Sequence, residues 1–203
     1  MAKKREKLVV GRKLRNIIMD DKTIARIMKV NHAGEYGAIR IYNAQLLVSK
    51  ILHKELVTFL ETIVAHEIDH CQKFIQAMHA RQARSCAAMS FWGIGGWTLG
   101  FITACLGKNA IMICTAAVEE TVHRHLQEQI IYLENRDEEL RRLIIEIQKE
   151  ELQHLQYAEN NLKNSLLARP LSYLITISTE IVIWLSTQGD VSKMRNAIRA
   201  YNY

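Results

Sequence analysis

Two copies of one pattern of acidic and histidine residues lie at a fixed distance along the chain, and this repeat constrains the fold more than any other feature. Each copy holds a glutamate followed by a Glu-x-x-His element. The first copy is Glu35, Glu67 and His70, and the second is Glu119, Glu151 and His154. One and the same offset separates every member of the second copy from its counterpart in the first. Such self-similarity indicates a duplicated unit, so we expect two copies of one helical hairpin.

The chain contains few residues that break helices. A single proline, Pro170, and nine glycines occur among 203 residues, so long helices can form almost everywhere. Apolar residues recur at helical spacing and predict two hairpins, formed by residues 21–50 with 55–84 and by residues 109–134 with 138–168. Asp20 or Asp21 is the expected cap of the first helix, and turns are expected near His53 and at residues 134–137. We therefore predict an all-α bundle.

Two apolar segments accompany the hairpins. Residues 87–106 are all uncharged and long enough to cross a bilayer, but their glycines favour a short buried or interfacial helix. Residues 171–189 carry one charge, Glu180, which either pairs with another residue or faces water. We expect additional apolar helices between the hairpins and at the C-terminus.

The net charge of +6 comes from one end of the chain. Residues 1–16 hold seven basic residues and one acid, so the remainder sums to zero. We expect residues 1–20 to form a basic, flexible tail and residues 21–203 to form the helical domain. The tail is either a solvated end or a segment attracted to an anionic membrane surface, and no motif supports a nucleic-acid partner.

The cysteines show neither a Cys-x-x-Cys pair nor the spacing of a disulfide framework. Cys71, Cys86, Cys105 and Cys114 are expected to be reduced residues, three of them in apolar surroundings. No apolar stretch follows the basic N-terminal residues, so no secretory signal is expected. An intracellular protein is predicted.

The geometry of the predicted hairpins brings the repeated residues together. With a turn near Leu52, Glu35 and Glu67 lie at almost equal distances along the sequence on either side of the turn. At about 1.5 Å of rise per residue, the two carboxylates reach nearly the same height on adjacent helices. The second hairpin repeats this relation, so six ligands converge. Two glutamates with two Glu-x-x-His elements are the ligand set of ferritin-like carboxylate bundles, which hold two iron or manganese ions.

Each predicted ligand has an expected role. Glu67 and Glu151 are expected to bridge two ions, Glu35 and Glu119 to bind one ion each, and His70 and His154 to do likewise. Glu120 competes locally with Glu119, as does His123 one turn away, but the repeat selects Glu119. Three histidines without symmetric partners are expected to lie around the ligands or at the surface: His32, His66 and His125.

Residues 31–38, Asn-His-Ala-Gly-Glu-Tyr-Gly-Ala, are the most specific string in the chain, and Arg40-Ile41-Tyr42 follows them. In this string the chain resembles the demethoxyubiquinone hydroxylase family of ubiquinone biosynthesis. Further agreement comes from Glu67-x-Asp69-His70, Leu106-Gly107-Lys108, Ala117-Val118-Glu119-Glu120 and Glu150-Glu151-Leu152. The resemblance covers about residues 23–186.

The resemblance implies a di-iron monooxygenase that uses O₂ to hydroxylate a polyprenylated methoxy-methyl-benzoquinone, with NADH or another reductant as electron source. It implies the same six ligands that the repeat selects. The expected partners are the membrane-resident quinone, a membrane surface, a lipid-binding accessory protein, other ubiquinone-biosynthesis proteins and further copies in an oligomer. The expected location is the cytoplasmic face of a bacterial inner membrane. Family members carry a His-Tyr pair where this chain has His125-Leu126, so the electron route is left open.

A ferritin-like protein that binds or stores iron, without quinone chemistry, is the alternative. It would share the six ligands. The uncharged segment 87–106 counts against it, because a soluble storage shell has little use for such a stretch. The aromatic residues of this segment either cover an isoprenoid tail, dip into a membrane, or form ordinary core: Phe91, Trp92, Trp97 and Phe101.

Overall fold

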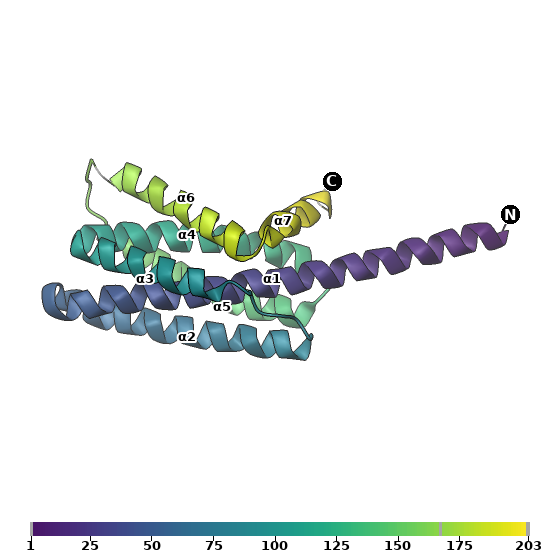
Figure 1. Cartoon of the computed structure of the whole chain (residues 1–203), viewed down its shortest axis with the longest axis horizontal. Helices are drawn as coiled ribbons and strands as arrows, with labels where there is room; N and C mark the ends of the chain where they lie inside the picture. Colours follow the sequence, from purple (N-terminus) through teal and green to yellow (C-terminus); the bar gives the residue numbers. More distant parts are fainter. Residues whose placement is uncertain (1, 167, 202–203) are drawn as a thin grey trace.

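The protein is a bundle of long helices. A computed structural model describes residues 2–166 and 168–201, with the side chains of residues 20–166, 168–185 and 187–200. These residues form seven α-helices, one short 3-10 helix and no strand, which confirms the predicted all-α, ferritin-like class (Figure 1). The helices are α1 Ala2–Leu52, η1 Lys54–Leu56, α2 Val57–Ala80, α3 Met89–Cys105, α4 Lys108–Leu133, α5 Glu138–Asn161, α6 Ala168–Ser186 and α7 Asp190–Tyr201.

The repeated unit is larger than a hairpin. As predicted, α1 packs on α2 and α4 packs on α5, with turns after Leu52 and at residues 134–137. In addition, α3 packs along α1, and α6 packs along α4. Each half of the chain is therefore a hairpin followed by a third helix that covers the hairpin's first helix.

The first helix begins much earlier than predicted. We expected a start at Asp21 with an aspartate cap, but α1 begins at Ala2 and its first part projects beyond the bundle (Figure 1). Only one glycine, Gly11, and no proline interrupt this stretch, so nothing in the sequence ends the helix there. Asp20 instead accepts a hydrogen bond from the Tyr132 hydroxyl at 2.8 Å. The division into a flexible tail and a domain stays a prediction.

Three other helix ends differ from the prediction. α2 ends at Ala80 rather than near Arg84, and Gln82 just beyond it has a left-handed φ of 51°. α5 ends at Asn161 rather than near residue 168. The C-terminal apolar helix turns at Gly189, whose φ of +74° favours glycine, and a separate helix follows.

Glycines of α3 allow two backbones to touch. A Cβ atom at Gly96 would lie 2.6 Å from the carbonyl oxygen of Gly37 on α1. A Cβ atom at Gly100 would collide with the backbone of Ile41. The glycines in the uncharged segment therefore allow close helix packing, which explains why small residues are frequent in this segment.

Within the described part of the chain, no helix by itself combines the length and the apolar character needed to cross a membrane. Among these residues, only α6 and α7 taken together have the required length and hydropathy, and this pair is bent by 97°.

The close approach of α3 to α1 predicts a large effect of one methyl group. Gly100→Ala should lower the free energy of unfolding by about 2 kcal/mol, because the backbones must move apart. Gly95→Ala on the same helix is the control, since its Cβ would meet only Val182 at 3.9 Å. That variant should be neutral or gain about 0.5–1 kcal/mol from the helix preference of alanine. Urea denaturation measures both, and equal stability of the two variants would contradict the packing argument.

Candidate metal centre

The structure brings all six predicted ligands into the centre of the bundle. Glu35 comes from α1, Glu67 and His70 from α2, Glu119 from α4, and Glu151 and His154 from α5. None of the six is more than 4% exposed. Glu120, the competing neighbour of Glu119, is exposed on the outside of α4, so the repeat selected the inward-facing residue of this pair.

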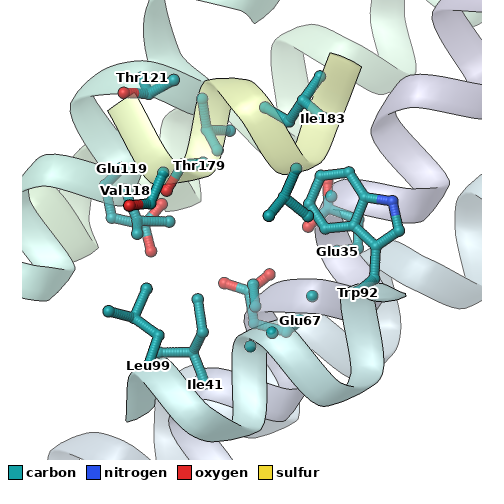
Figure 2. A pocket seen from close by; sticks show the side chains of 18 of the residues that line it. Glu35, Ile41, Glu67, Trp92, Leu99, Val118, Glu119, Thr121, Thr179 and Ile183 are labelled. Atoms are coloured by element: carbon teal, nitrogen blue, oxygen red, sulfur yellow. The ribbon is translucent and has the colours of Figure 1, made fainter. Parts of the chain in front are cut away.

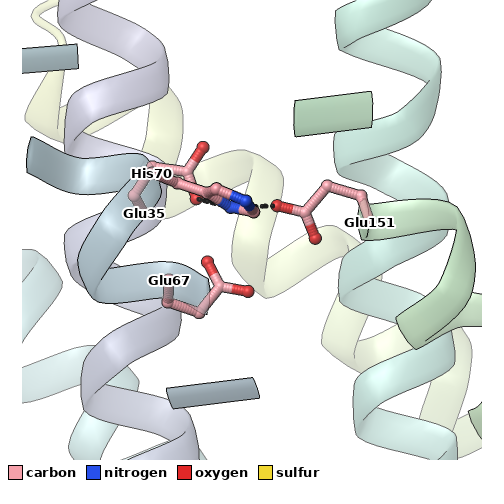
Figure 3. Close-up of side chains that lie close together, drawn as sticks. All are labelled: Glu35, Glu67, His70 and Glu151. Carbon is pink, nitrogen blue, oxygen red and sulfur yellow. Dashed lines mark ion pairs between the residues drawn. The ribbon is translucent and has the colours of Figure 1, made fainter. Parts of the chain in front are cut away.

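The six side chains form two groups that could each hold one metal ion. In each group, the candidate ligand atoms lie within 4.8 Å of one another. The first group is Glu35, Glu67, His70 and Glu151, and the second is Glu67, Glu119, Glu151 and His154. Figure 3 shows the first group. The two groups share two carboxylates, Glu67 and Glu151, which are the residues expected to bridge.

Glu151 lies between the two imidazoles. Its Oε1 atom is 3.1 Å from His70 Nδ1, and its Oε2 atom is 3.1 Å from His154 Nδ1. His70 Nδ1 also faces Glu35 at 3.8 Å, and His154 Nδ1 faces Glu67 at 3.7 Å. Both histidines therefore turn the same ring nitrogen toward the shared carboxylates.

The centre concentrates buried carboxyl groups inside the bundle. Burial and the neighbouring carboxylates raise the pKa of Glu67 and of Glu119 well above the usual value. Burial opposes ionisation of Glu151 as well, but the hydrogen bond from His154 and the contact with His70 lower its pKa. Burial likewise disfavours the charged form of His70, yet contacts with Glu151 and Glu35 raise its pKa to about 11.

These residues fit a pair of divalent cations. Within the described part of the chain, neither carboxylate oxygen of Glu67 makes a hydrogen bond, although both are buried. A buried carboxylate without donors is costly, and cations at the two groups would remove that cost. Four carboxylates and two imidazoles, with no thiolate, suit iron or manganese better than structural zinc.

Polar side chains hold the candidate ligands from behind. The Tyr42 hydroxyl donates a short hydrogen bond to Glu119 Oε1. His70 Nε2 lies 3.0 Å from Glu150 Oε2, and His154 Nε2 lies 3.0 Å from His66 Nδ1. The expectation that His66 lies around the ligands is confirmed. Tyr42 and Glu150 were missed as parts of the centre, although both lie within the strings that carried the resemblance.

An apolar cavity of about 420 Å³ opens beside the carboxylates. Residues of α1, α3, α4 and α6 form its walls, and Glu35, Glu67, Glu119 and Glu151 contribute to its lining. Figure 2 shows the carboxylates of Glu67 and Glu119 turned toward the open space. Of the aromatic residues singled out in the sequence, Trp92 is buried in this wall, while Phe91 is largely exposed.

A polar cluster surrounds His125, a residue of the cavity wall. Glu180 of α6 does not simply face water, because its Oε1 atom lies 3.3 Å from His125 Nε2 and accepts a hydrogen bond from Arg195 at 2.8 Å. These contacts lower the pKa of Glu180 to about 2. His125 also lines the cavity. His32 is buried in α1 and is therefore not a surface residue.

Comparison with known proteins places this arrangement in a family. The family model described as ubiquinone biosynthesis protein COQ7 matches residues 22–186. The chain belongs to the COQ7 family. This confirms the resemblance seen in the sequence, and α7 lies beyond the part of the chain that the family model matches.

Curated relatives in the COQ7 family are hydroxylases. The chain is 33% identical to "NADPH-dependent 3-demethoxyubiquinone 3-hydroxylase, mitochondrial" of Dictyostelium discoideum, over 81% of this chain and 77% of that protein. It is 34% identical to "3-demethoxyubiquinol 3-hydroxylase" of Rhodospirillum rubrum, over 80% of this chain and 77% of that protein. The human protein with the same name as the first is 39% identical, over 64% of this chain and 61% of its own length. These relatives support a hydroxylase of ubiquinone biosynthesis.

The raised pKa values predict that metal binding releases protons. In the metal-free protein, the raised pKa values of Glu67 and Glu119 mean that these carboxyl groups keep their protons to a higher pH than usual, and a cation must displace those protons. The affinity for Mn²⁺ should therefore be higher at pH 8 than at pH 6. Calorimetry in two buffers of different ionisation enthalpy measures the protons released. Glu119→Gln should reduce both affinity and proton release, whereas Glu120→Gln should change neither, and binding without proton release would contradict the electrostatic argument.

Proposed function

We propose that the protein hydroxylates the ring of a polyprenylated methoxy-methyl-benzoquinone, converting demethoxyubiquinone to demethylubiquinone, with O₂ as co-substrate at a di-iron centre. One observation carries the proposal: two ligand groups that share Glu67 and Glu151 border an apolar cavity. A metal pair alone would suit iron storage as well. The adjoining cavity adds a place for an apolar substrate beside the ligands.

The cavity has the chemistry of a quinone site. Its volume of about 420 Å³ suits a substituted ring with the first part of its prenyl tail. Apolar side chains such as Leu99, Val118 and Ile183 form most of the wall and would exclude water from the ring. The ring would lie nearest the carboxylates, with the tail leading out between α3 and α6.

The ligands would divide the work of holding two iron ions. Glu67 and Glu151 would bind both ions, Glu35 and His70 would complete one position, and Glu119 and His154 the other. When bound, the iron pair supplies the activation of O₂ and the transfer of one oxygen atom. Tyr42 fixes the orientation of Glu119 through its hydrogen bond, and the buried helices keep the six side chains in place.

Two helices beside the cavity carry exposed apolar side chains. On α3 these are Phe91, Ile94, Trp97, Phe101, Ile102 and Leu106 at its end, and on α6 they are Tyr173, Leu174, Ile177, Ile181, Trp184 and Leu185. We propose that this face lies on a membrane and that the quinone enters from it. The basic residues near the N-terminus would add attraction to anionic lipid. A peripheral position on the cytoplasmic face of a bacterial inner membrane follows as part of the proposal.

The remaining partners are also proposals. A nicotinamide nucleotide, NADH or NADPH, is the proposed electron source, and the names of several relatives include NADPH. Electrons could pass near His125, which lines the cavity and is followed by Leu126. A lipid-binding accessory protein, other ubiquinone-biosynthesis proteins and oligomer formation are proposed partners, whereas nucleic acid is not.

Product analysis tests the activity. Iron-loaded protein, a demethoxyquinone with a short prenyl tail, O₂ and a reductant should give a product with one additional oxygen, while two electrons and two protons convert the other oxygen atom to water. Glu67→Ala and His154→Ala should each lose iron and product formation. Glu159→Ala, an exposed residue on α5, should keep both. Iron binding without product in mass spectrometry would favour the storage alternative, and product formation by either ligand variant would refute the di-iron proposal.

The opening of the cavity provides a second test. Thr98 on α3 and Ser178 on α6 line the cavity and are also exposed, so they mark its opening. Thr98→Trp should keep two irons per chain but raise KM for a long-chain quinone at least about tenfold, since a bulky ring would narrow the entrance. Thr62→Trp, on the exposed side of α2, is the control. An unchanged KM in Thr98→Trp would exclude entry between α3 and α6.

A further inference from the structure

The two halves of the candidate metal centre differ in the residue directly before the shared glutamate. His66 precedes Glu67, and Glu150 precedes Glu151. The offset that relates the two sets of ligands also relates His66 to Glu150, so these two residues occupy equivalent places in the duplicated unit. An imidazole in one half therefore corresponds to a carboxylate in the other.

Each of these residues contacts the histidine of the opposite half. Glu150 Oε2 lies 3.0 Å from His70 Nε2, and His66 Nδ1 lies 3.0 Å from His154 Nε2. The rings of His66 and His154 are also stacked, with centroids 5.2 Å apart. The contacts cross between α2 and α5, so the equivalence seen in the sequence is also an equivalence in space.

The tautomers follow from the two contacts. His70 and His154 turn Nδ1 toward the carboxylates, so a bound metal leaves the proton on Nε2. In that state His70 donates its Nε2 proton to the Glu150 carboxylate, whereas His154 donates to Nδ1 of His66. A carboxylate acceptor makes the imidazole a stronger metal ligand than a neutral acceptor does, and such outer partners typically change metal affinity by about 10- to 100-fold.

A second difference acts in the same direction. The Tyr42 hydroxyl donates to Glu119, which withdraws electron density from this ligand. The residue equivalent to Tyr42 in the second copy is Leu126, whose side chain has no donor. The repeat thus gives Glu35 no equivalent phenol, and the position formed by Glu119 and His154 is the weaker one on both counts.

We propose that the two metal positions are inequivalent and that the position of Glu35 and His70 fills first. The difference arises because the first copy of the duplicated unit has His66 where the second copy has the carboxylate of Glu150. His66 is a positioning residue in this scheme, because it acts through His154. The inference rests on the proposed metal centre, and goes beyond it by assigning an order to the two ions.

Repulsion between two cations by itself gives two binding steps. Paired substitutions therefore test whether the residue that accepts the histidine proton, Glu150 or His66, sets the strength of each step. Metal-free protein is titrated with Co²⁺, followed by its visible absorption. Glu150→Gln replaces the carboxylate by a neutral amide and should weaken the first step by about 10- to 100-fold. His66→Gln exchanges one neutral acceptor for another and should leave the first step unchanged. Both residues are partly exposed, with side chains 30% and 36% accessible, so neither substitution opens the core.

Proton NMR identifies the position that fills first. At one Co²⁺ per chain, the hyperfine-shifted imidazole N–H signal should move in Glu150→Gln and stay in place in His66→Gln, if His70 binds the first ion. The double variant His66→Glu/Glu150→His keeps the same pair of groups but exchanges their places, and it should transfer the first signal to His154. Circular dichroism checks the helix content of every variant.

The outcomes distinguish the inference from the function on which it rests. Binding of two Co²⁺ per chain, with equal effects of Glu150→Gln and His66→Gln on the first step, would leave the metal centre standing and overturn the inequivalence. A first signal from His154 in the unmodified protein would overturn it too. Absence of Co²⁺ binding in the unmodified, helical protein would overturn both.

Discussion

Four carboxylates are buried within one small volume, and their mutual repulsion is the constraint on which the rest of the structure depends. Burial raises the free energy of each negative charge, and the neighbouring carboxylates raise it further. The protein keeps Glu67 and Glu119 at almost zero exposure nevertheless, on helices of 24 and 26 residues. Rigid helices from two hairpins can hold such a cluster. Because the helices pack along their whole length, a single carboxylate cannot become solvated without disturbing that packing.

The duplicated unit is nearly symmetric in its ligands but not in its packing. α3 carries Gly96 and Gly100, so its backbone touches α1. α6 contains no glycine and cannot approach α4 in the same way. Its residues, among them Thr179 and Ile183, instead face an open space that reaches the carboxylates. The third helix of the unit thus touches the hairpin's first helix in one copy, whereas in the other copy it leaves room for the cavity, which α3 also lines.

Much of the centre could be predicted from the sequence because it depends on distances along regular helices. The constant offset between the two copies was enough to choose Glu119 over Glu120, and the rise per residue predicted that the carboxylates of each hairpin lie at the same height. Contacts between different helices could not be obtained in this way. The contact between Glu150 and His70 depends on how α2 and α5 pack, and no local sequence pattern predicts it. The early start of α1 was missed for another reason. Aspartate is a residue type that often caps helices, but Asp20 lies inside α1 and accepts a hydrogen bond from Tyr132 instead.

The sequence contains a helical pattern for α7 that our prediction did not include. In α7, Val191, Met194 and Ile198 recur at helical spacing, and all three are buried. Asp190 at its start pairs with Lys29 of α1 at 2.7 Å. Arg195 contacts both His125 on α4 and Glu180 on α6, so one side chain from beyond the family-matched residues joins two walls of the cavity. A residue whose ring is held by a guanidinium and a carboxylate has little freedom to reorient. His125 therefore has a fixed environment, although Leu126 follows it where the resemblance led us to expect a tyrosine.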